Sequence, residues 1–562
     1  MSLRVRIAFE VLVVFIFCTA LFGQDQDYFR SPIGHDTRLS GSFAEPRSAH
    51  FHAGIDFKQK KGVPYDTIYA AADGFISRIN IMPDGYGNAL YIDHPNGYTT
   101  VYAHLHHFNE PITDYISDVM IKKRIHKIEH YPKAQKLKVS KGDYIGILGN
   151  TGRSFGAHLH FEIRKTDSET PVNPALFNLK PKDNLPPTIR GIVIYSLTPD
   201  GEVLDQDYYS VVATDKDRYT LKQELIRTDA LMVGIGIHAY DTMNGASNHN
   251  GAYGVSLKNN GREIHSFKMD SVSFDHSRYI HAHMDYEAKI NNRYISKCYN
   301  LDSNPLEIYD TTLTSGRIIT SDLIANHLEI DVYDIEGNRA TVEFDLIRED
   351  DEFKPNEIDT TYIRVTPVKP ISGSRGKFKW EAPEGIVEKP EYLKIDSNGD
   401  TLNIRGLGEV PMFRYLKLSY TSDKELTKST LIATQNKKGQ LMSLGCEAKD
   451  SISLVTFVNR TGRYWIDRDT VAPNIKVLNL PKGLSRRIRF KMSDNYESSY
   501  YRDQLRFEVY IDDTWVLCQH DIKNNTVWHD IDFIPTNQIH KLKVKVSDSC
   551  GNVTEVTKSF KY

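Results

Sequence analysis

Four histidines and one aspartate stand at spacings that suit metal chemistry. His52 and Asp56 lie in the segment HFHAGIDF, His104 lies in VYAHLHH, and His158 and His160 lie in GAHLHFEIR. Neutral imidazole and carboxylate are ordinary zinc ligands. In a hydrolytic zinc site, three protein ligands leave an open position for a water molecule whose pKa falls to about 7. Two further imidazoles can take the proton of that water and stabilise the oxyanion. The set therefore matches three ligands and two catalytic groups.

The segment HFHAGIDF predicts an extended strand that presents two ligands on one face. Because side chains alternate along a strand, His52, Gly54 and Asp56 point the same way. Gly54 has no side chain, so we expect a cation to sit above the strand within reach of both neighbours. A histidine and an aspartate at this spacing also occur by chance on protein surfaces.

The segment GAHLHFEIR predicts a second strand, with one polar and one apolar face. His158, His160 and Glu162 share the polar face, and the residues between them are apolar. Two imidazoles on one face are costly to bury unless a metal or hydrogen bonds satisfy them. Spacing leaves open which of the two histidines is a ligand and whether Glu162 takes part. The alternative is a half-exposed polar strand face.

Five motifs in order give these residues a context: HFHAGID, DGYGN, NGYTTVYAHL, KGDYIGILGNTG and GAHLHFEI. Over about residues 41–174 they resemble the lysostaphin-type (LytM-type) zinc endopeptidases, metallopeptidase family twenty-three. The resemblance implies a β-rich fold, a bound Zn²⁺ ion and hydrolysis of peptide bonds in bacterial peptidoglycan. Carried over position by position, it implies three zinc ligands, His52, Asp56 and His160, and two catalytic residues, His104 and His158.

The alternative function is that of a non-catalytic envelope protein. Family members that lack the site residues act as binding regulators of other wall enzymes, whereas all five positions here carry the expected residue types. In that alternative the first domain would bind peptidoglycan or regulate another cell-wall hydrolase. A third interpretation is an adhesin in which the metal is only structural.

The sequence around these residues predicts a mainly antiparallel β domain over residues 27–180, whose strands must position the site. Short alternating runs such as GFISRINI, ALYIDH and YIGILG are separated by Gly and Asn-Gly turns. Asn96-Gly97 is the turn of a hairpin. An interruption at about 108–137 has apolar residues at helical spacing, so we expect a helical insertion beside His104.

The rest of the chain predicts tandem β-sandwich modules over residues 185–349, 350–469 and 470–562. The segments IDVYDIEGN and VKVSDSCGN are alternating strands that end in the same Asp-x-x-Gly-Asn turn, and HAYDTMNG near Asp241 is a weaker third copy. The prolines of DNLPP and DTVAP mark module boundaries. The modules resemble bacterial immunoglobulin-like domains. We expect them to act as spacers or to bind the cell wall or envelope protein partners. The alternative is that they are a plain scaffold without a ligand.

Length, charge and the amino-terminal residues indicate the class of protein and its cellular compartment. The chain has 562 residues, which predicts three or four domains, and its net charge of -3 provides no general attraction for nucleic acid. Residues 1–23 carry two arginines followed by the apolar run VLVVFIFCTALF, as in a signal peptide. We expect export to the periplasm, cell envelope or medium, with an uncleaved anchor as the alternative. Cys518 and Cys550 could form a disulfide or remain free thiols. The sequence does not indicate the oligomeric state.

Overall fold

The computed structural model describes most of the chain after the predicted signal peptide. The predicted leader, residues 1–23, and Cys446 lie outside the described residues. Within the part that is described, no helix has the length and apolar character needed to cross a bilayer. The described residues are 27–562 except 48, 200, 350–358, 446, 483–484, 499–504 and 532–533.

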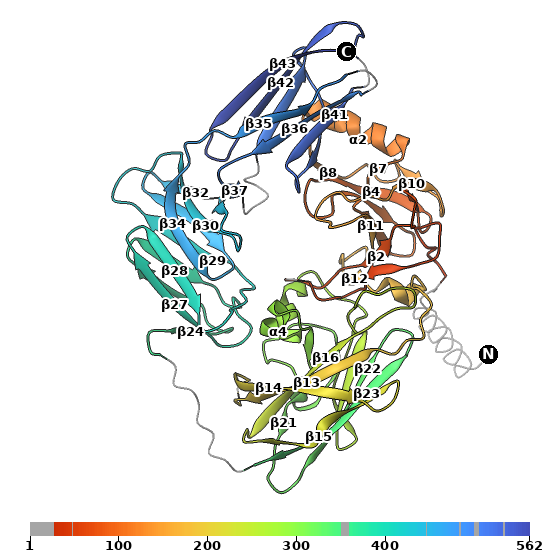
Figure 1. Cartoon of the computed structure of the whole chain (residues 1–562), viewed down its shortest axis with the longest axis vertical. Helices are drawn as coiled ribbons and strands as arrows, with labels where there is room; N and C mark the ends of the chain where they lie inside the picture. Colours follow the sequence, from red (N-terminus) through yellow and green to blue (C-terminus); the bar gives the residue numbers. More distant parts are fainter. Residues whose placement is uncertain are drawn as a thin grey trace, which may run out of the picture.

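The chain is mainly β, as predicted, and its four parts follow one another around a circle (Figure 1). The first domain carries the predicted site residues. The second, third and fourth parts continue round the circle, and the fourth returns beside helix α2 of the first domain. Segments distant in sequence therefore lie side by side.

The first domain is built on an antiparallel sheet in which β11 is central. The strands pair in the order β1-β2-β11-β6-β5-β4-β8, with β12 beside β11 and β9 beside β4. Their bounds are β1 Leu39–Gly41, β2 Ile55–Lys58, β4 Gly74–Ile81, β5 Asn88–Asp93, β6 Tyr98–Ala103, β8 Ile128–His130, β9 Lys138–Val139, β11 His158–Lys165 and β12 Pro171–Val172. A smaller sheet comprises β3 Thr67–Tyr69, β10 Tyr144–Ile147 and β7 His107–Phe108. The short helix η1, Pro174–Phe177, follows.

The apolar face of β11 anchors the core of the first domain. Leu159, Phe161 and Ile163 are fully buried. The ring of Phe161 packs edge-on against Phe57 of β2 and Tyr102 of β6, with centroids 6.0 and 5.3 Å apart. Burying these apolar side chains stabilises the pairing of β11 with both neighbours and holds its opposite face in place.

The insertion contains one helix, α2, Glu110–Lys123. Asn109 caps it by accepting a hydrogen bond from the Ile112 N–H, and Arg124 ends it in a left-handed conformation. Its buried face consists of Ile112, Ile116 and Met120, at helical spacing. After α2 the chain forms β8, which pairs with β4, so the insertion is only partly helical.

The second part is a large sheet system with short helices. Two long strands, β14 and β15, connect its two halves, and the pairing of β15 with β23 is parallel. The strands are β13 Thr188–Leu197, β14 Val203–Ala213, β15 Arg218–Thr228, β16 Met232–Tyr240, β17 Gly254–Asn259, β18 Arg262–Lys268, β19 Ile295–Lys297, β20 Tyr309–Thr312, β21 Ile318–Ile319, β22 Asn326–Tyr333 and β23 Arg339–Arg348. The helices are η2 Ser277–Tyr279, α3 Ile280–His283, α4 Tyr286–Ile290 and η3 Leu313–Gly316.

The third and fourth parts each place two sheets around a core of their own. The strands of the third are β24 Ile363–Val365, β25 Ile371–Arg375, β26 Phe378–Ala382, β27 Glu391–Asn398, β28 Thr401–Gly406, β29 Leu416–Thr421, β30 Thr430–Gln435, β31 Leu441–Ser443, β32 Glu447–Asp450, β33 Ser453–Val458 and β34 Gly462–Arg468. Those of the fourth are β35 Asn474–Asn479, β36 Arg487–Ser493, β38 Arg506–Ile511, β39 Thr514–Trp515, β40 Gln519–Asp521, β41 Thr526–Asp530, β42 Ile539–Ser547 and β43 Val553–Lys561. The short strand β37, Glu497–Ser498, follows β36 in the chain but pairs with β31 of the third part. The immunoglobulin-like resemblance stays a prediction. Cys518 and Cys550 are both free thiols.

The fourth part contacts the first domain at two places. The imidazole of His126 stacks between Phe507 and Trp515, with ring centroids 4.5 and 4.6 Å away. The Cys518 N–H also donates a 3.0 Å hydrogen bond to His126 Nδ1. At the second place, Lys523 Nζ donates to the main-chain carbonyls of residues 150 and 154, at 2.5 and 3.0 Å.

Residues of the second part form hydrogen bonds with the loop at 47–51, which precedes His52. The Phe51 N–H donates a 3.0 Å hydrogen bond to Ser277 Oγ of η2. Lys289 Nζ of α4 donates to the Arg47 carbonyl. Both ends of the loop before His52 are therefore held by residues from outside the first domain.

Candidate metal and catalytic site

The register of β11 brings the predicted site residues together. His160 lies opposite Asp56 of β2 on one side and Ala103 of β6 on the other. His104 directly follows β6 in a left-handed conformation, with φ of 62°. His158 begins β11 and forms a bridge to the loop before it. Three sequence segments thus deliver their side chains to one end of three neighbouring strands.

The predicted strand over HFHAGIDF begins later than expected. β2 starts at Ile55, so His52 lies in the extended segment that precedes it. Gly54 is required for a different reason from the one expected. A Cβ there would lie 2.2 Å from the Phe161 carbonyl oxygen and 2.8 Å from Glu162 Cγ. The glycine lets the backbone approach β11 closely, and this approach brings His52 to His160.

Three side-chain atoms converge at the centre of the site. His52 Nε2 lies 2.9 Å from His160 Nδ1 and 3.0 Å from Asp56 Oδ1, and His160 Nδ1 is also 3.0 Å from Asp56 Oδ1. All three residues are buried. Two imidazole nitrogens and a carboxylate oxygen facing one point form a donor set that fits Zn²⁺.

The outer nitrogen of each ligand histidine is held by an acceptor. His52 Nδ1 is 2.7 Å from the Ser42 carbonyl, and His160 Nε2 is 2.7 Å from Glu162 Oε1. Donating a proton to these acceptors leaves the lone pairs of His52 Nε2 and His160 Nδ1 directed at the centre. Such outer hydrogen bonds fix the tautomer and orientation of metal-binding histidines.

Glu162, whose part in the site the sequence left open, contacts His160 directly. Its carboxylate is fully buried and accepts 2.6 Å hydrogen bonds from Tyr86 Oη and Arg164 Nε as well as from His160. Burial alone would raise its pKa, but Arg164 and His160 outweigh burial and lower the pKa of Glu162 to about 2. In the sequence, the feature that pointed to Glu162 was its position on the same strand face as His160.

Charge at the centre is set by Asp56. Burial alone would raise its pKa, but His52 and His160 outweigh burial and hold the pKa of Asp56 well below its ordinary value. Arg47 Nη2 binds the outer oxygen Oδ2 at 3.0 Å, which leaves Oδ1 for the centre. Burial would lower the pKa of His160, but Asp56 and Glu162 raise it to about 9. The centre is therefore built to hold positive charge.

The two predicted catalytic histidines flank this centre. His104 Nδ1 and His158 Nδ1 each lie 2.8 Å from a main-chain carbonyl, those of Thr151 and Gly156. Their ring centroids are 4.9 Å apart, and His158 Nε2 lies 3.5 Å from Asp56 Oδ1. Burial and the neighbouring His160 lower the pKa of His104 to about 3, and burial also lowers the pKa of His158. Both imidazoles are neutral at neutral pH and able to accept a proton.

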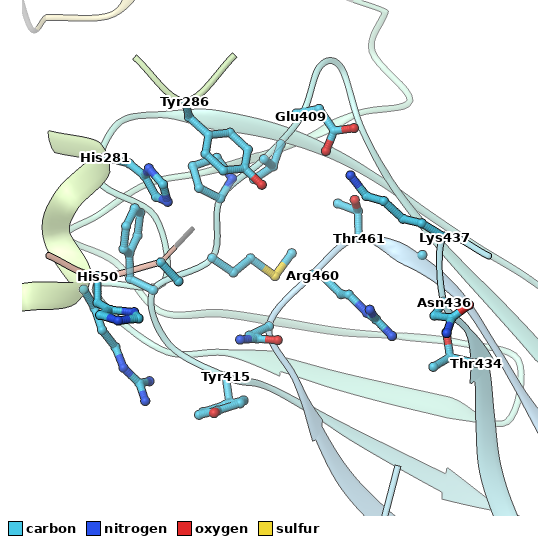
Figure 2. Close-up of a pocket in the computed structure, with 18 of the residues that line it drawn as sticks. His50, His281, Tyr286, Glu409, Tyr415, Thr434, Asn436, Lys437, Arg460 and Thr461 are labelled. Atoms are coloured by element: carbon cyan, nitrogen blue, oxygen red, sulfur yellow. The ribbon is translucent and has the colours of Figure 1, made fainter. Parts of the chain in front are cut away.

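A separate pocket lies between the second and third parts, and His50 of the first domain also lines it (Figure 2). His50 and Tyr286 face Glu409 and Arg460 across it. Within the part of the chain that is described, no three metal-ligating side chains converge there, whereas they do at the centre between β2 and β11. The converging side chains that could hold a metal ion therefore lie at the centre and not in this pocket.

The comparisons with known proteins concern the part of the chain that carries these residues. The model of Peptidase family M23 matches residues 50–118 and 119–174. This confirms the predicted resemblance for the first domain, while the immunoglobulin-like resemblance of the later parts is not confirmed.

Two curated relatives are similar over the same part of the chain. The DD-carboxypeptidase/endopeptidase Mpg of Neisseria meningitidis serogroup B is 38% identical, over 26% of this chain and 24% of its own length. The peptidoglycan DD-endopeptidase ShyA of Vibrio cholerae is 32% identical, over 26% of this chain and 32% of its own length. A solved zinc containing peptidase from Vibrio cholerae is 26% identical, covering 28% of this chain and 40% of that one, with a TM-score of 0.20. The chain thus spans about a quarter to a third of the length of these curated relatives.

Proposed function

We propose that the chain is an exported zinc endopeptidase that hydrolyses peptide bonds of bacterial peptidoglycan, in a stem peptide or a cross-bridge. The observation that carries this proposal is the convergence of His52 Nε2, Asp56 Oδ1 and His160 Nδ1 beside two neutral histidines. The peptidoglycan endopeptidases among its relatives support the substrate class and an envelope location.

The three central residues would bind Zn²⁺, which would supply a water molecule activated for attack on a peptide carbonyl. Asp56 contributes the negative charge, and Arg47 orients its carboxylate. The Ser42 carbonyl and Glu162 keep the two ligand imidazoles in the required tautomer.

His104 and His158 perform the proton chemistry. Because each directs Nδ1–H to a main-chain carbonyl, Nε2 is the atom that accepts the proton of the attacking water and later donates it to the leaving amine. The one imidazole that receives this proton also stabilises the oxyanion, while the other remains neutral. The carbonyls of Thr151 and Gly156 hold both rings in place, so little reorganisation is needed during the reaction.

The test is release of peptide fragments from purified peptidoglycan by the mature chain. Zinc-loaded chain should release fragments, and a chelator or the substitution His160→Ala should reduce release to background. Equal activity of the chain and His160→Ala would contradict the zinc assignment. Zinc-loaded chain that binds sacculi and leaves every cross-link intact would instead support the non-catalytic alternative.

A further inference from the structure

Two groups of three aspartates lie outside the catalytic site. In each group, one carboxylate oxygen from every residue lies within 4.8 Å of the others. One group stands where the chain passes from the first domain into the second part, and the other where it passes from the third part into the fourth. The groups are Asp183, Asp241 and Asp334, and Asp469, Asp494 and Asp548.

The two groups are built from equivalent positions. Asp183 and Asp469 lie in the segments that lead into β13 and β35, the first strands of their parts. Asp241 directly follows β16, as Asp494 follows β36. The third member of each group begins an Asp-x-x-Gly-Asn turn after β22 or β42. The segment around Asp241 is therefore not a third copy of that turn, as the sequence suggested, but the partner of the turn within one part.

The hydrogen bonds repeat as well. Asn338 donates its main-chain N–H to Asp334 Oδ1 at 2.9 Å and its side-chain Nδ2 to Oδ2 at 2.7 Å. The same Nδ2 lies 3.4 Å from the main-chain carbonyl of Asp183. In the fourth part, Asn552 makes the corresponding contacts with Asp548 at 2.9 and 2.8 Å and with the Asp469 carbonyl at 3.2 Å. The asparagine thus ties the carboxylate of the third aspartate to the main chain of the first aspartate in each group.

An unpartnered carboxylate oxygen remains in each group. Asp241 is 3% exposed, and its Oδ1 is buried without a hydrogen-bond partner. Asp494 is only half-buried as a residue, but its Oδ1 atom is also buried without a hydrogen-bond partner. A buried acceptor without a partner is costly, and a buried carboxylate more so. Burial, together with the other aspartates of each group, raises the pKa of Asp241 to about 7 and that of Asp494 to about 6. Each group therefore places like charges together around a buried carboxylate oxygen.

We propose that each aspartate group binds one calcium ion. The donors are all hard oxygen atoms, the class that calcium prefers, and flexible coordination by six to eight oxygens accommodates three carboxylates, nearby carbonyls and water. The ion neutralises three carboxylates that otherwise repel, and it partners the buried oxygen of Asp241 or Asp494.

The first calcium site connects the catalytic domain to its neighbour. A pocket at this junction is lined by Ser42 and Asn173 from the first domain and by Asp241, Tyr253 and Asp334 from the second part. The carbonyl of Ser42 is also the acceptor that orients the predicted zinc ligand at position 52. Calcium at this place makes the junction rigid directly behind the loop that carries that ligand.

The test measures calcium binding to the zinc-loaded full chain by equilibrium dialysis against radioactive calcium chloride. Extracellular calcium modules have dissociation constants of about 10⁻⁴ to 10⁻³ M, so a concentration of about 5 mM approaches saturation. The chain should bind two calcium ions, Asp241→Asn or Asp494→Asn one, and the double variant none. Calcium should also raise the melting temperature of the chain but not that of the double variant.

A matched control separates specific binding from surface charge. Asp345→Asn removes an exposed carboxylate from the second part, outside the groups, and should leave two bound calcium ions. Asparagine has nearly the size of aspartate and removes charge repulsion, so the variants should fold, which circular dichroism checks. Absence of saturable calcium binding, or two bound ions in the double variant, would overturn the proposal.

Discussion

Histidines gather in two regions of the molecule, and the two regions differ in the side chains that surround the rings. At the catalytic centre, His160 lies between the carboxylates of Asp56 and Glu162, and its pKa is raised to about 9. At the contact with the fourth part, His126 lies between two aromatic rings, and its pKa is lowered to about 4 by burial, then by His520 and His529. The His160 ring has two carboxylates as hydrogen-bond partners, whereas the neighbours of the half-buried His126 ring are two aromatic rings and two further histidines.

This difference separates imidazoles that can bind a cation from imidazoles that serve as packing. A carboxylate offsets the cost of placing positive charge beside a buried histidine, whereas an aromatic sandwich favours the neutral ring. The buried Nε2 of His126 and of His520 have no hydrogen-bond partner, which fits a neutral ring used for its shape. Histidine content alone therefore does not identify a metal centre; the neighbouring acids do.

The largest expected effect is on catalysis. His158→Ala should lower peptidoglycan cleavage by about 10² to 10⁴-fold, because it removes a proton-transfer group, while zinc content stays unchanged. His126→Phe preserves the aromatic stack and should keep cleavage within a few-fold. Fragment release and metal analysis of both variants measure the contrast. Comparable losses in the two would erase the distinction between the regions.

The next effect concerns zinc affinity and pH. Because the pKa of His160 is raised to about 9 in the metal-free chain, zinc must displace a proton throughout the neutral range. Apparent affinity should therefore fall about tenfold per pH unit, or about 100-fold from pH 8 to pH 6. Competition with a chromogenic chelator measures this slope, and a flat profile would show that His160 is neutral before zinc binds.

Glu162→Gln should have a smaller effect. Glutamine keeps the size of the side chain but loses the charge that orients His160 and pairs with Arg164, so zinc affinity should fall about 10 to 100-fold. The pH slope of zinc binding should also become shallower, because the raised pKa of His160 depends partly on Glu162. Glu129→Gln, at a half-exposed position away from the centre, is the control. Unchanged affinity and slope would remove Glu162 from the site.

The smallest effect is the response of the His126 contact to acid. The pKa of His126 is about 4 in the closed structure against 6.5 for an ordinary histidine, so the open state binds more protons between these values. Closure is fully favourable above pH 6.5 and weakens as pH falls toward 4, by about 1–2 kcal/mol at pH 5. Trp515 fluorescence, which the stacked His126 ring influences, should follow the opening. His126→Phe should abolish this acid response; an unchanged response would assign it to another group.

The part of the site that follows strand periodicity was predictable from the sequence. Alternation in GAHLHFEIR correctly separates the buried face of Phe161 from the face of His158 and His160. The main-chain acceptors at Ser42 and Thr151 were not predictable, because any residue supplies a carbonyl and only the folded loops place it.

The later parts show where local patterns mislead. In the sequence, Asp241 resembles the first residue of a repeated turn, because the pattern covers only the end of a single strand. In the structure, Asp241 at the end of β16 lies beside Asp334 at the end of β22, within the same part. The contact of Lys523 with the loop after β10 had no local signal either, since it depends on how four parts are arranged. Pairings of this kind are set by tertiary packing and not by propensity.

The contact between Cys518 and His126 joins residues 392 positions apart, so it is among the most non-local contacts of the molecule. Contacts that close long loops form late in folding, because the entropy of closure precedes the energy gained. A chain that folds from its amino terminus would complete the centre between β2 and β11 before the fourth part is available. The hydrogen bonds from Lys523 to the carbonyls of residues 150 and 154 would then be the last contacts to form around the centre.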